Sequence, residues 1–256
     1  MKKYDTMQCE ILYQKQPAPG VHDWLIDAEE LAALATPGQF VHVLVPGKTL
    51  RRPISICDID KEAGVLRLVF QVRGEGTELL AQKRLGDTID ILGPLGHGFD
   101  LGDTGRRALF VGGGIGVPPL LAAAKPFGAN ATVILGFQNR DAVILARDFA
   151  MAGCQVFVAT DDGSMGFHGL VTDCLKNYLP ADVLFACGPR PMLRALAAVA
   201  EENNMPAQFS LEERMACGVG ACLGCASKTL VDGKEQYLHV CKNGPVFDSR
   251  AIVWEG

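Results

Sequence analysis

Apolar and polar residues alternate in short runs through the first hundred residues of the chain. Alternation of this kind indicates half-buried β-strands, which are separated here by turns rich in glycine and proline. The predicted strands cover residues 8–14, 22–26, 39–45, 66–72 and 88–92. One helical stretch, residues 76–83, interrupts them. Many short strands joined by such turns predict a small antiparallel β-barrel.

The pattern changes after Arg106 and Arg107, where apolar strands begin to alternate with helical segments. A short buried strand at 108–111 leads through a glycine-rich turn into an alanine-rich helix. Further strands are predicted at 132–137, 155–159 and 182–186, with helices at 140–151, 170–178 and 191–202. This alternation predicts a parallel sheet with helices on both faces and functional residues at the carboxyl ends of its strands. The glycine- and proline-rich segment 93–98 predicts a domain edge.

Four cysteines near the end of the chain have a diagnostic spacing. Four residues separate Cys217 from Cys222, two separate Cys222 from Cys225, and fifteen separate Cys225 from Cys241. This is the spacing of plant-type [2Fe–2S] sites, in which four thiolates hold two irons. A structural zinc site usually has two separated cysteine pairs instead. Four buried or disulfide-bonded cysteines without a metal are the other alternative.

The chain is therefore predicted to be a multi-domain protein of three parts. They are an antiparallel β-barrel (1–98), an α/β nucleotide-binding domain with a parallel sheet (99–207) and a small C-terminal [2Fe–2S] domain (208–256). The length of 256 residues suits this division.

Composition excludes several functional classes. With 48% hydrophobic and 21% charged residues, the chain has the composition of an ordinary soluble globular protein, and its net charge of −5 gives no electrostatic reason to bind nucleic acid. Glycines and prolines interrupt the apolar stretch 108–124, which predicts no membrane span. Residues 1–6 lead into no apolar leader segment. Five further cysteines lack any disulfide spacing, which predicts a reducing cytoplasm: Cys9, Cys57, Cys154, Cys174 and Cys187.

Two elements of the predicted barrel suit a phosphorylated cofactor. Arg52, Pro53 and Ser55 combine a guanidinium and a hydroxyl on a stiffened stretch of chain, a combination that can bind a phosphate and a flat ring. Gly76 and Thr77 lie in a glycine-rich turn that opens the predicted helix, and helix N-termini attract anions. A surface arginine and a helix cap are the alternative interpretation.

Three turns fall at the predicted carboxyl ends of the parallel strands. They comprise Gly112, Gly113, Gly114, Ile115 and Gly116; then Asp161, Asp162 and Gly163; then Cys187, Gly188 and Pro189. A strand, a glycine turn and a helix can cradle a pyrophosphate, although the same turn can simply be a tight connection. Arg140 could meet a 2′-phosphate or lie exposed at a helix start, so the pattern leaves NAD and NADP open.

The order of these elements resembles that of the ferredoxin–NADP reductase superfamily. The resemblance implies that Arg52 contacts the FAD pyrophosphate and that Ser55 contacts the flavin ring. Ile54 stands where the superfamily often has a tyrosine that stacks on the ring. The strand residues Val69, Phe70 and Gln71 are also implied in FAD binding. Cys187 would lie near the reactive carbon of the nicotinamide, with a buried core cysteine as the alternative.

The three predicted sites together favour electron transfer. Nicotinamide exchanges two electrons as a hydride, a [2Fe–2S] cluster exchanges one, and a flavin does both, so the flavin belongs between the other two. A cluster at the end of the chain suits electron transfer to another protein. A metal-binding or redox-sensing regulator without hydride chemistry is the alternative from another class.

Nearly the whole chain also resembles the electron-transfer subunits of type B dihydroorotate dehydrogenase. The most specific match is Glu212-Glu213-Arg214, which an ordinary solvated charge run would also explain. The resemblance implies FAD, one [2Fe–2S] cluster, NAD as a diffusible substrate, and a heterotetramer with two copies of an FMN-containing catalytic subunit. Electrons from dihydroorotate would pass from FMN through the cluster and FAD to NAD⁺, in cytoplasmic pyrimidine biosynthesis. The nearest rival is the small subunit of an NADH-dependent ferredoxin:NADP oxidoreductase or a sulfide dehydrogenase.

Overall fold

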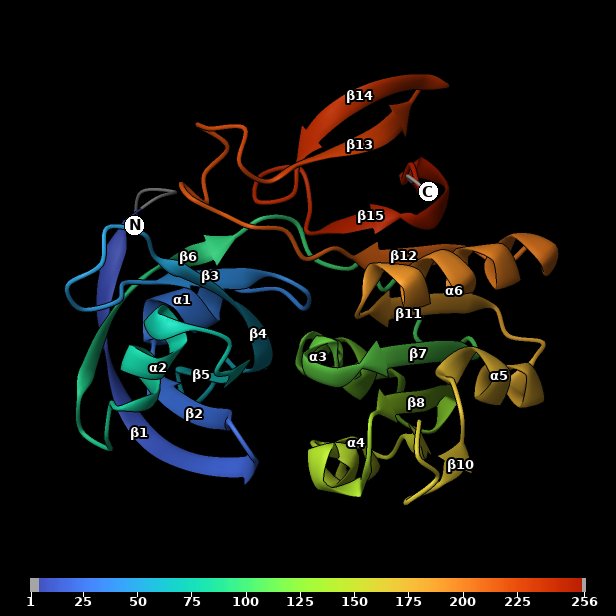
Figure 1. The fold of residues 1–256 in the computed structure, drawn as a ribbon, viewed down its shortest axis with the longest axis horizontal. Helices are drawn as coiled ribbons and strands as arrows, with labels where there is room; N and C mark the ends of the chain where they lie inside the picture. Colours follow the sequence, from blue (N-terminus) through green and yellow to red (C-terminus); the bar gives the residue numbers. More distant parts are fainter. Residues whose placement is uncertain (1–4, 255–256) are drawn as a thin grey trace.

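A computed structural model describes residues 5–254 of the chain. The barrel and the parallel sheet lie side by side, and the C-terminal segment lies over both of them (Figure 1). Residues 1–4 and 255–256 lie outside the described part. The prediction that no leader segment is present rests in part on residues 1–4. Within residues 5–254, no helix has the length and apolar character that crossing a membrane requires.

The N-terminal part is the predicted antiparallel barrel. Its six strands close in the order β1-β2-β5-β4-β3-β6, and every neighbouring pair is antiparallel. The fully buried side chains of Trp24, Ile56 and Leu68 lie in its core. The strands are β1 (Thr6–Ala18), β2 (Val21–Asp27), β3 (Phe40–Val43), β4 (Arg52–Asp60), β5 (Val65–Gln71) and β6 (Thr88–Leu95).

Three details of the barrel differ from the sequence prediction. Strand β4 and the short helix α1 (Glu29–Leu34) were not predicted. The predicted domain edge at 93–98 begins inside a strand, because β6 continues through Pro94 until Leu95 pairs with Phe40. The predicted helix is α2 (Glu75–Ala81).

The second part is the predicted parallel sheet with helices on both faces. Its strands follow the order β10-β9-β8-β7-β11-β12-β15, and all neighbours are parallel except β12 and β15. Helices α3 and α4 pack on one face, and α5 and α6 on the other. The strands are β7 (Ala108–Gly113), β8 (Ala131–Phe137), β9 (Gln155–Thr160), β10 (Phe167–His168), β11 (Val183–Cys187), β12 (Ala207–Ser210) and β15 (Val246–Asp248).

Most helices of the sheet domain are shorter than predicted. The glycine turn leads into two 3₁₀ turns before a four-residue α3, because the consecutive Pro118 and Pro119 supply no backbone N–H donors. The predicted helix 140–151 is interrupted at Leu145, whose φ is 61°. The helices are α3 (Leu121–Ala124), α4 (Ala146–Met151), α5 (Val171–Leu175) and α6 (Arg190–Glu202).

The C-terminal segment is built onto the edge of this sheet. Strand β12 crosses the predicted boundary at 207/208, and β15 returns to pair with β12. Between them, a loop with no regular structure leads to the hairpin of β13 (Ala226–Val231) and β14 (Lys234–His239). Both ends of the cysteine-containing segment are therefore fixed to the sheet, and the domain limits stay a prediction.

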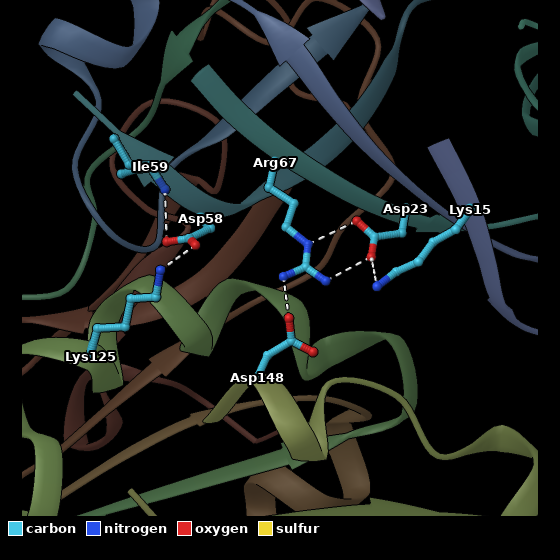
Figure 2. Close-up of polar contacts among 7 residues, drawn as sticks. All are labelled: Lys15, Asp23, Asp58, Ile59, Arg67, Lys125 and Asp148. Carbon is cyan, nitrogen blue, oxygen red and sulfur yellow. Dashed lines mark hydrogen bonds and ion pairs between the residues drawn. The ribbon is translucent and has the colours of Figure 1, made fainter. Parts of the chain in front are cut away.

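Ion pairs join the barrel to the sheet domain (Figure 2). Arg67 of β5 forms a two-pronged pair with Asp23, with Nε–Oδ1 and Nη2–Oδ2 distances of 2.8 and 2.7 Å. The same guanidinium contacts Asp148 of α4, and Lys125 contacts Asp58 of β4. The two parts also share one buried apolar cluster, so the barrel holds a fixed orientation on the sheet.

Candidate functional site

A cleft lies where the barrel, the glycine turn and the C-terminal segment meet. Strands β4 and β5 form one wall, and the start of the cysteine-containing loop forms another. Its lining residues are Phe40, Pro53, Ile54, Ser55, Val69, Phe70, Gln71, Arg73, Thr77, Ile115, Ser210, Leu211, Glu212, Glu213, Met215 and Pro245. Most residues predicted for the flavin thus share one cleft, and Ile115, predicted for the dinucleotide, lies there too.

The phosphate-binding elements of the barrel converge at the start of α2. The Arg52 guanidinium lies so close to Gly76 that a Cβ atom there would collide with it. Thr77 Oγ1 accepts hydrogen bonds from the backbone N–H groups of Arg73 and Gly74, at 2.9 and 3.2 Å. A cation thus lies directly over a helix N-terminus, which is an arrangement that could hold a phosphate.

Two of the three predicted nucleotide turns pack against each other. A Cβ atom at Gly116 would lie 2.5 Å from the carbonyl oxygen of Cys187, and one at Gly188 would lie 3.1 Å from the backbone nitrogen of Gly113. Only glycine allows this close approach of two backbones. The turns that follow β7 and β11 therefore form one surface at the carboxyl ends of neighbouring strands.

The acidic turn lies further along the same edge, after β9. Asp162 accepts a 2.9 Å hydrogen bond from the backbone N–H of Ser164. The Arg140 guanidinium donates from Nε and Nη2 to the carbonyl oxygen of Ser164, at 3.1 and 2.8 Å. Arg140 thus lies exposed at the start of a 3₁₀ turn, with its guanidinium hydrogen-bonded to the acidic turn.

Burial raises the pKa values of two titratable groups near the cleft. Cys187 is fully buried, and burial raises the pKa of its thiol well above the usual value, so the thiol stays protonated. The Glu212 side chain is open to the cleft, but desolvation by the surrounding protein raises the pKa of its carboxyl, and Arg73 opposes this rise only partly. The site thus has no thiolate nucleophile at Cys187.

The four cysteines of the predicted cluster site form two pairs. Cys217 Sγ and Cys222 Sγ lie 3.4 Å apart, and Cys241 donates its backbone N–H to Cys225 Sγ at 3.5 Å. Residues 5–254 contain no ready-made group of three ligands for a single metal ion. Two thiol pairs instead fit a two-iron cluster, in which two cysteines serve each iron.

Backbone N–H groups in this loop favour negative charge on the cysteine sulfurs. The Gly220 N–H donates to Cys241 Sγ at 3.2 Å. Burial acts to raise the pKa of Cys217, but hydrogen bonds from backbone N–H groups, such as those of Val219 and Cys222, outweigh burial and lower it to about 6. Gly218 and Gly220 have φ values of 71° and 78°, which lets the chain turn inward around the sulfurs.

Comparison with known proteins agrees with this geometry. Residues 212–253 match the family described as the iron-sulfur cluster binding domain of dihydroorotate dehydrogenase B. The dihydroorotate dehydrogenase B (NAD⁺) electron transfer subunit of Bacillus caldolyticus is 47% identical over 250 residues, covering 94% of this chain and 95% of that protein. The corresponding subunit from a Geobacillus species is 44% identical over 255 residues, covering 96% and 98%. This chain belongs to the dihydroorotate dehydrogenase B electron transfer subunit family.

Other matches agree with this family and its cofactors. Residues 27–99 match the oxidoreductase FAD-binding domain family, so FAD and an iron–sulfur cluster are the cofactors of this oxidoreductase subunit. An NADH-dependent reduced ferredoxin-NADP oxidoreductase structure superposes with a TM-score of 0.83 at 31% identity, covering 96% of this chain and 89% of that one. A ferredoxin NADP⁺ reductase from Neisseria gonorrhoeae, 18% identical with a TM-score of 0.65 over 77% of this chain and 91% of that one, shares the fold.

Sequence reasoning missed several lining residues of the cleft. Phe40 and Arg73 belong to no recognisable motif, and only the folded chain brings them to the flavin residues. Glu212 had a signal, because the Glu-Glu-Arg triplet was the most specific resemblance to the family. Glu213 of this triplet pairs with Arg190 at 2.7 Å, which connects the cysteine loop to the start of α6.

Proposed function

We propose that the chain carries electrons from an FMN-containing dihydroorotate dehydrogenase catalytic subunit to NAD⁺. The observation that carries this proposal is the continuity of the two redox sites. Met215 lines the cleft that holds the flavin-binding residues, and Cys217 follows two residues later. The first cluster cysteine therefore lies next to the flavin cleft in the chain, which suits transfer between the two cofactors.

Dihydroorotate loses two electrons and two protons to become orotate. NAD⁺ takes two electrons and one proton to become NADH, so one proton is released. When bound, FAD exchanges a hydride with nicotinamide and single electrons with the cluster. Arg52 and the start of α2 would hold the FAD phosphates, and Ser55 would contact the flavin. The close-packed glycine and Cys-Gly-Pro turns would bind the nicotinamide nucleotide.

In this proposal Cys217, Cys222, Cys225 and Cys241 ligate the cluster. Leu223, with 75% of its surface exposed, lies between two of these cysteines in the loop. In this proposal the catalytic subunit docks at the face that carries the cysteine loop. The assembly is a heterotetramer with two copies of each subunit.

Anaerobic NADH oxidation with orotate as acceptor tests the function. The chain alone is expected to pass electrons from NADH to an artificial dye but not to orotate. Orotate reduction is expected only after a catalytic subunit of this family is added. Flavin reduction without any orotate reduction in the mixture would contradict the assigned partner.

The 31% identical ferredoxin-NADP oxidoreductase supports one alternative function. Reduction of ferredoxin, with NADP(H) replacing NAD(H), would favour that alternative in the same assay. The higher identity to the orotate-linked subunits, together with their near-complete coverage, favours the first proposal.

Arg52→Ala is expected to weaken FAD binding by about 1.5–3 kcal/mol, which is the usual contribution of a hydrogen bond to a charged group. The guanidinium over the start of α2 is the lost contact. Flavin per protein after gel filtration measures the effect. The exposed Arg84, in the same barrel, provides a matched control, and Arg84→Ala should keep its flavin. Equal flavin retention in both variants would argue against the phosphate contact.

A further inference from the structure

His42 of β3 is a buried imidazole without a hydrogen-bond partner. Its exposed fraction is 0%, and neither Nδ1 nor Nε2 has a partner among the residues that the structure describes. Buried polar groups are almost always hydrogen-bonded, because water satisfies them in the unfolded chain. We therefore expect this imidazole to have a hydrogen-bond partner that is not one of the described residues.

The ring faces the cysteine loop. A Cβ atom at Gly218 would lie 2.5 Å from Nδ1 and 2.9 Å from Cε1 of His42, so the backbone of Gly218 packs directly on the imidazole. Gly218 is buried and follows Cys217 in the chain. Nδ1 is thus the ring nitrogen nearest to the turn that begins at the first cysteine.

The other side of His42 belongs to the wall of the flavin cleft. In the pairing of β3 with β4, His42 lies opposite Pro53, and Pro53 lines the cleft. The ring of Phe40, another lining residue, lies edge-on to the imidazole with 6.3 Å between the ring centroids. His42 is therefore situated between the two proposed redox sites.

The imidazole is neutral at physiological pH. Burial, followed by the positive charges of Arg51 and Arg52, lowers its pKa to about 4. A neutral imidazole has one N–H donor and one acceptor nitrogen. The cluster is electron-rich and offers sulfur atoms as acceptors, and hydrogen bonds to those sulfurs are one of the factors that set cluster potentials.

We propose that His42 donates its Nδ1–H to a sulfur atom of the iron–sulfur cluster beside Cys217. Reduction adds negative charge to the cluster, so the hydrogen bond stabilises the reduced state more than the oxidised state. His42 is a positioning and tuning residue, and it raises the cluster potential. The inference rests on the proposed assignment of Cys217 as a cluster ligand.

The first test uses the whole chain in complex with a catalytic subunit and needs no substitution. Histidine labelled with ¹⁵N is incorporated into this chain alone, and pulsed EPR is recorded on the reduced cluster. A weak ¹⁵N coupling is expected from a hydrogen-bonded imidazole. A cluster signal without any ¹⁵N coupling would overturn the inference and leave the proposed function intact. Absence of a [2Fe–2S] signal would overturn the proposed function itself.

Two variants test the effect on the potential. His42→Phe keeps a ring but removes the donor, and His42→Asn keeps an N–H donor near the position of Nδ1. In EPR-monitored redox titrations, His42→Phe is expected to shift the cluster equilibrium about tenfold toward the oxidised form, which is about 59 mV for one electron. His42→Asn should recover much of this shift, and His42→Phe should also lose the ¹⁵N coupling. Equal potentials in the original chain and both variants would overturn the inference, as would a shift confined to the flavin.

Gly218→Ala and Gly220→Ala form a matched pair. Both positions have similar left-handed φ angles, so the backbone strain of an alanine is similar. The new methyl at 218 meets the rigid imidazole, whereas the one at 220 meets the flexible side chain of Lys242. Gly218→Ala is therefore expected to change the EPR line shape and potential of the cluster more than Gly220→Ala. Equal changes would contradict the contact between His42 and the loop.

Discussion

Cys222→Ser is expected to lose the iron–sulfur cluster while FAD stays bound. Its Sγ lies 3.4 Å from that of Cys217, and the pair is proposed to serve one iron. Loss of outer-shell partners alone costs about 10–100-fold in metal affinity, so loss of a ligand should cost more. Orotate-linked electron transfer should fall by more than about 100-fold. Transfer from NADH to a dye should remain, because it needs only the flavin.

Iron per protein and the visible absorption of the cluster measure this outcome. Cys174→Ser is the control, because Cys174 is a free, buried cysteine in α5, away from the cysteine loop. It should keep its iron and its orotate-linked activity. Normal cluster absorption in Cys222→Ser would refute the assignment of Cys222 as a ligand.

The sequence predicted the parts of this molecule whose signals are local. The cysteine spacing is contained in one short stretch, and it predicted the iron–sulfur cluster. Strand alternation predicted the barrel and the parallel sheet, because the period of two or of three to four residues follows from the backbone itself. Strand β4 was not predicted, because Arg51-Arg52-Pro53 resembles a surface loop. Pro53 is accommodated there although it has no N–H to donate to a neighbouring strand.

The remaining features depend on contacts between distant segments. Ser55 and Glu212 line one cleft although more than half of the chain separates them. The pairing of β15 with β12 is equally non-local, and no local pattern of residues predicts it. The His42 imidazole had no sequence signal, because a single histidine in an apolar strand usually belongs to the core. Only the packing of Gly218 against its ring reveals a connection with the cysteine loop.

Arg67→Ala is expected to destabilise the chain by about 3–5 kcal/mol, the usual cost of breaking a buried ion pair by removing one partner. Asp23 is only 1% exposed, and after the substitution it would keep Lys15 alone, at 3.3 Å. The melting temperature should fall by roughly 6–20 °C, since 1 kcal/mol corresponds to about 2–4 °C in a chain of this size. Thermal unfolding of the flavin-bound chain measures the change.

Asp148→Asn separates the two roles of Arg67. This variant keeps the two-pronged pair with Asp23 inside the barrel and weakens only the contact with α4 (Figure 2). Asp148 is 30% exposed, so its loss should cost about 1 kcal/mol or less. Hydride transfer from NADH to FAD should nevertheless slow, because this contact orients the sheet that carries the nucleotide turns against the barrel that carries the flavin. An equal loss of stability in Arg67→Ala and Asp148→Asn would contradict this division. In that case, the pair with the buried Asp23 carboxylate would contribute nothing to stability.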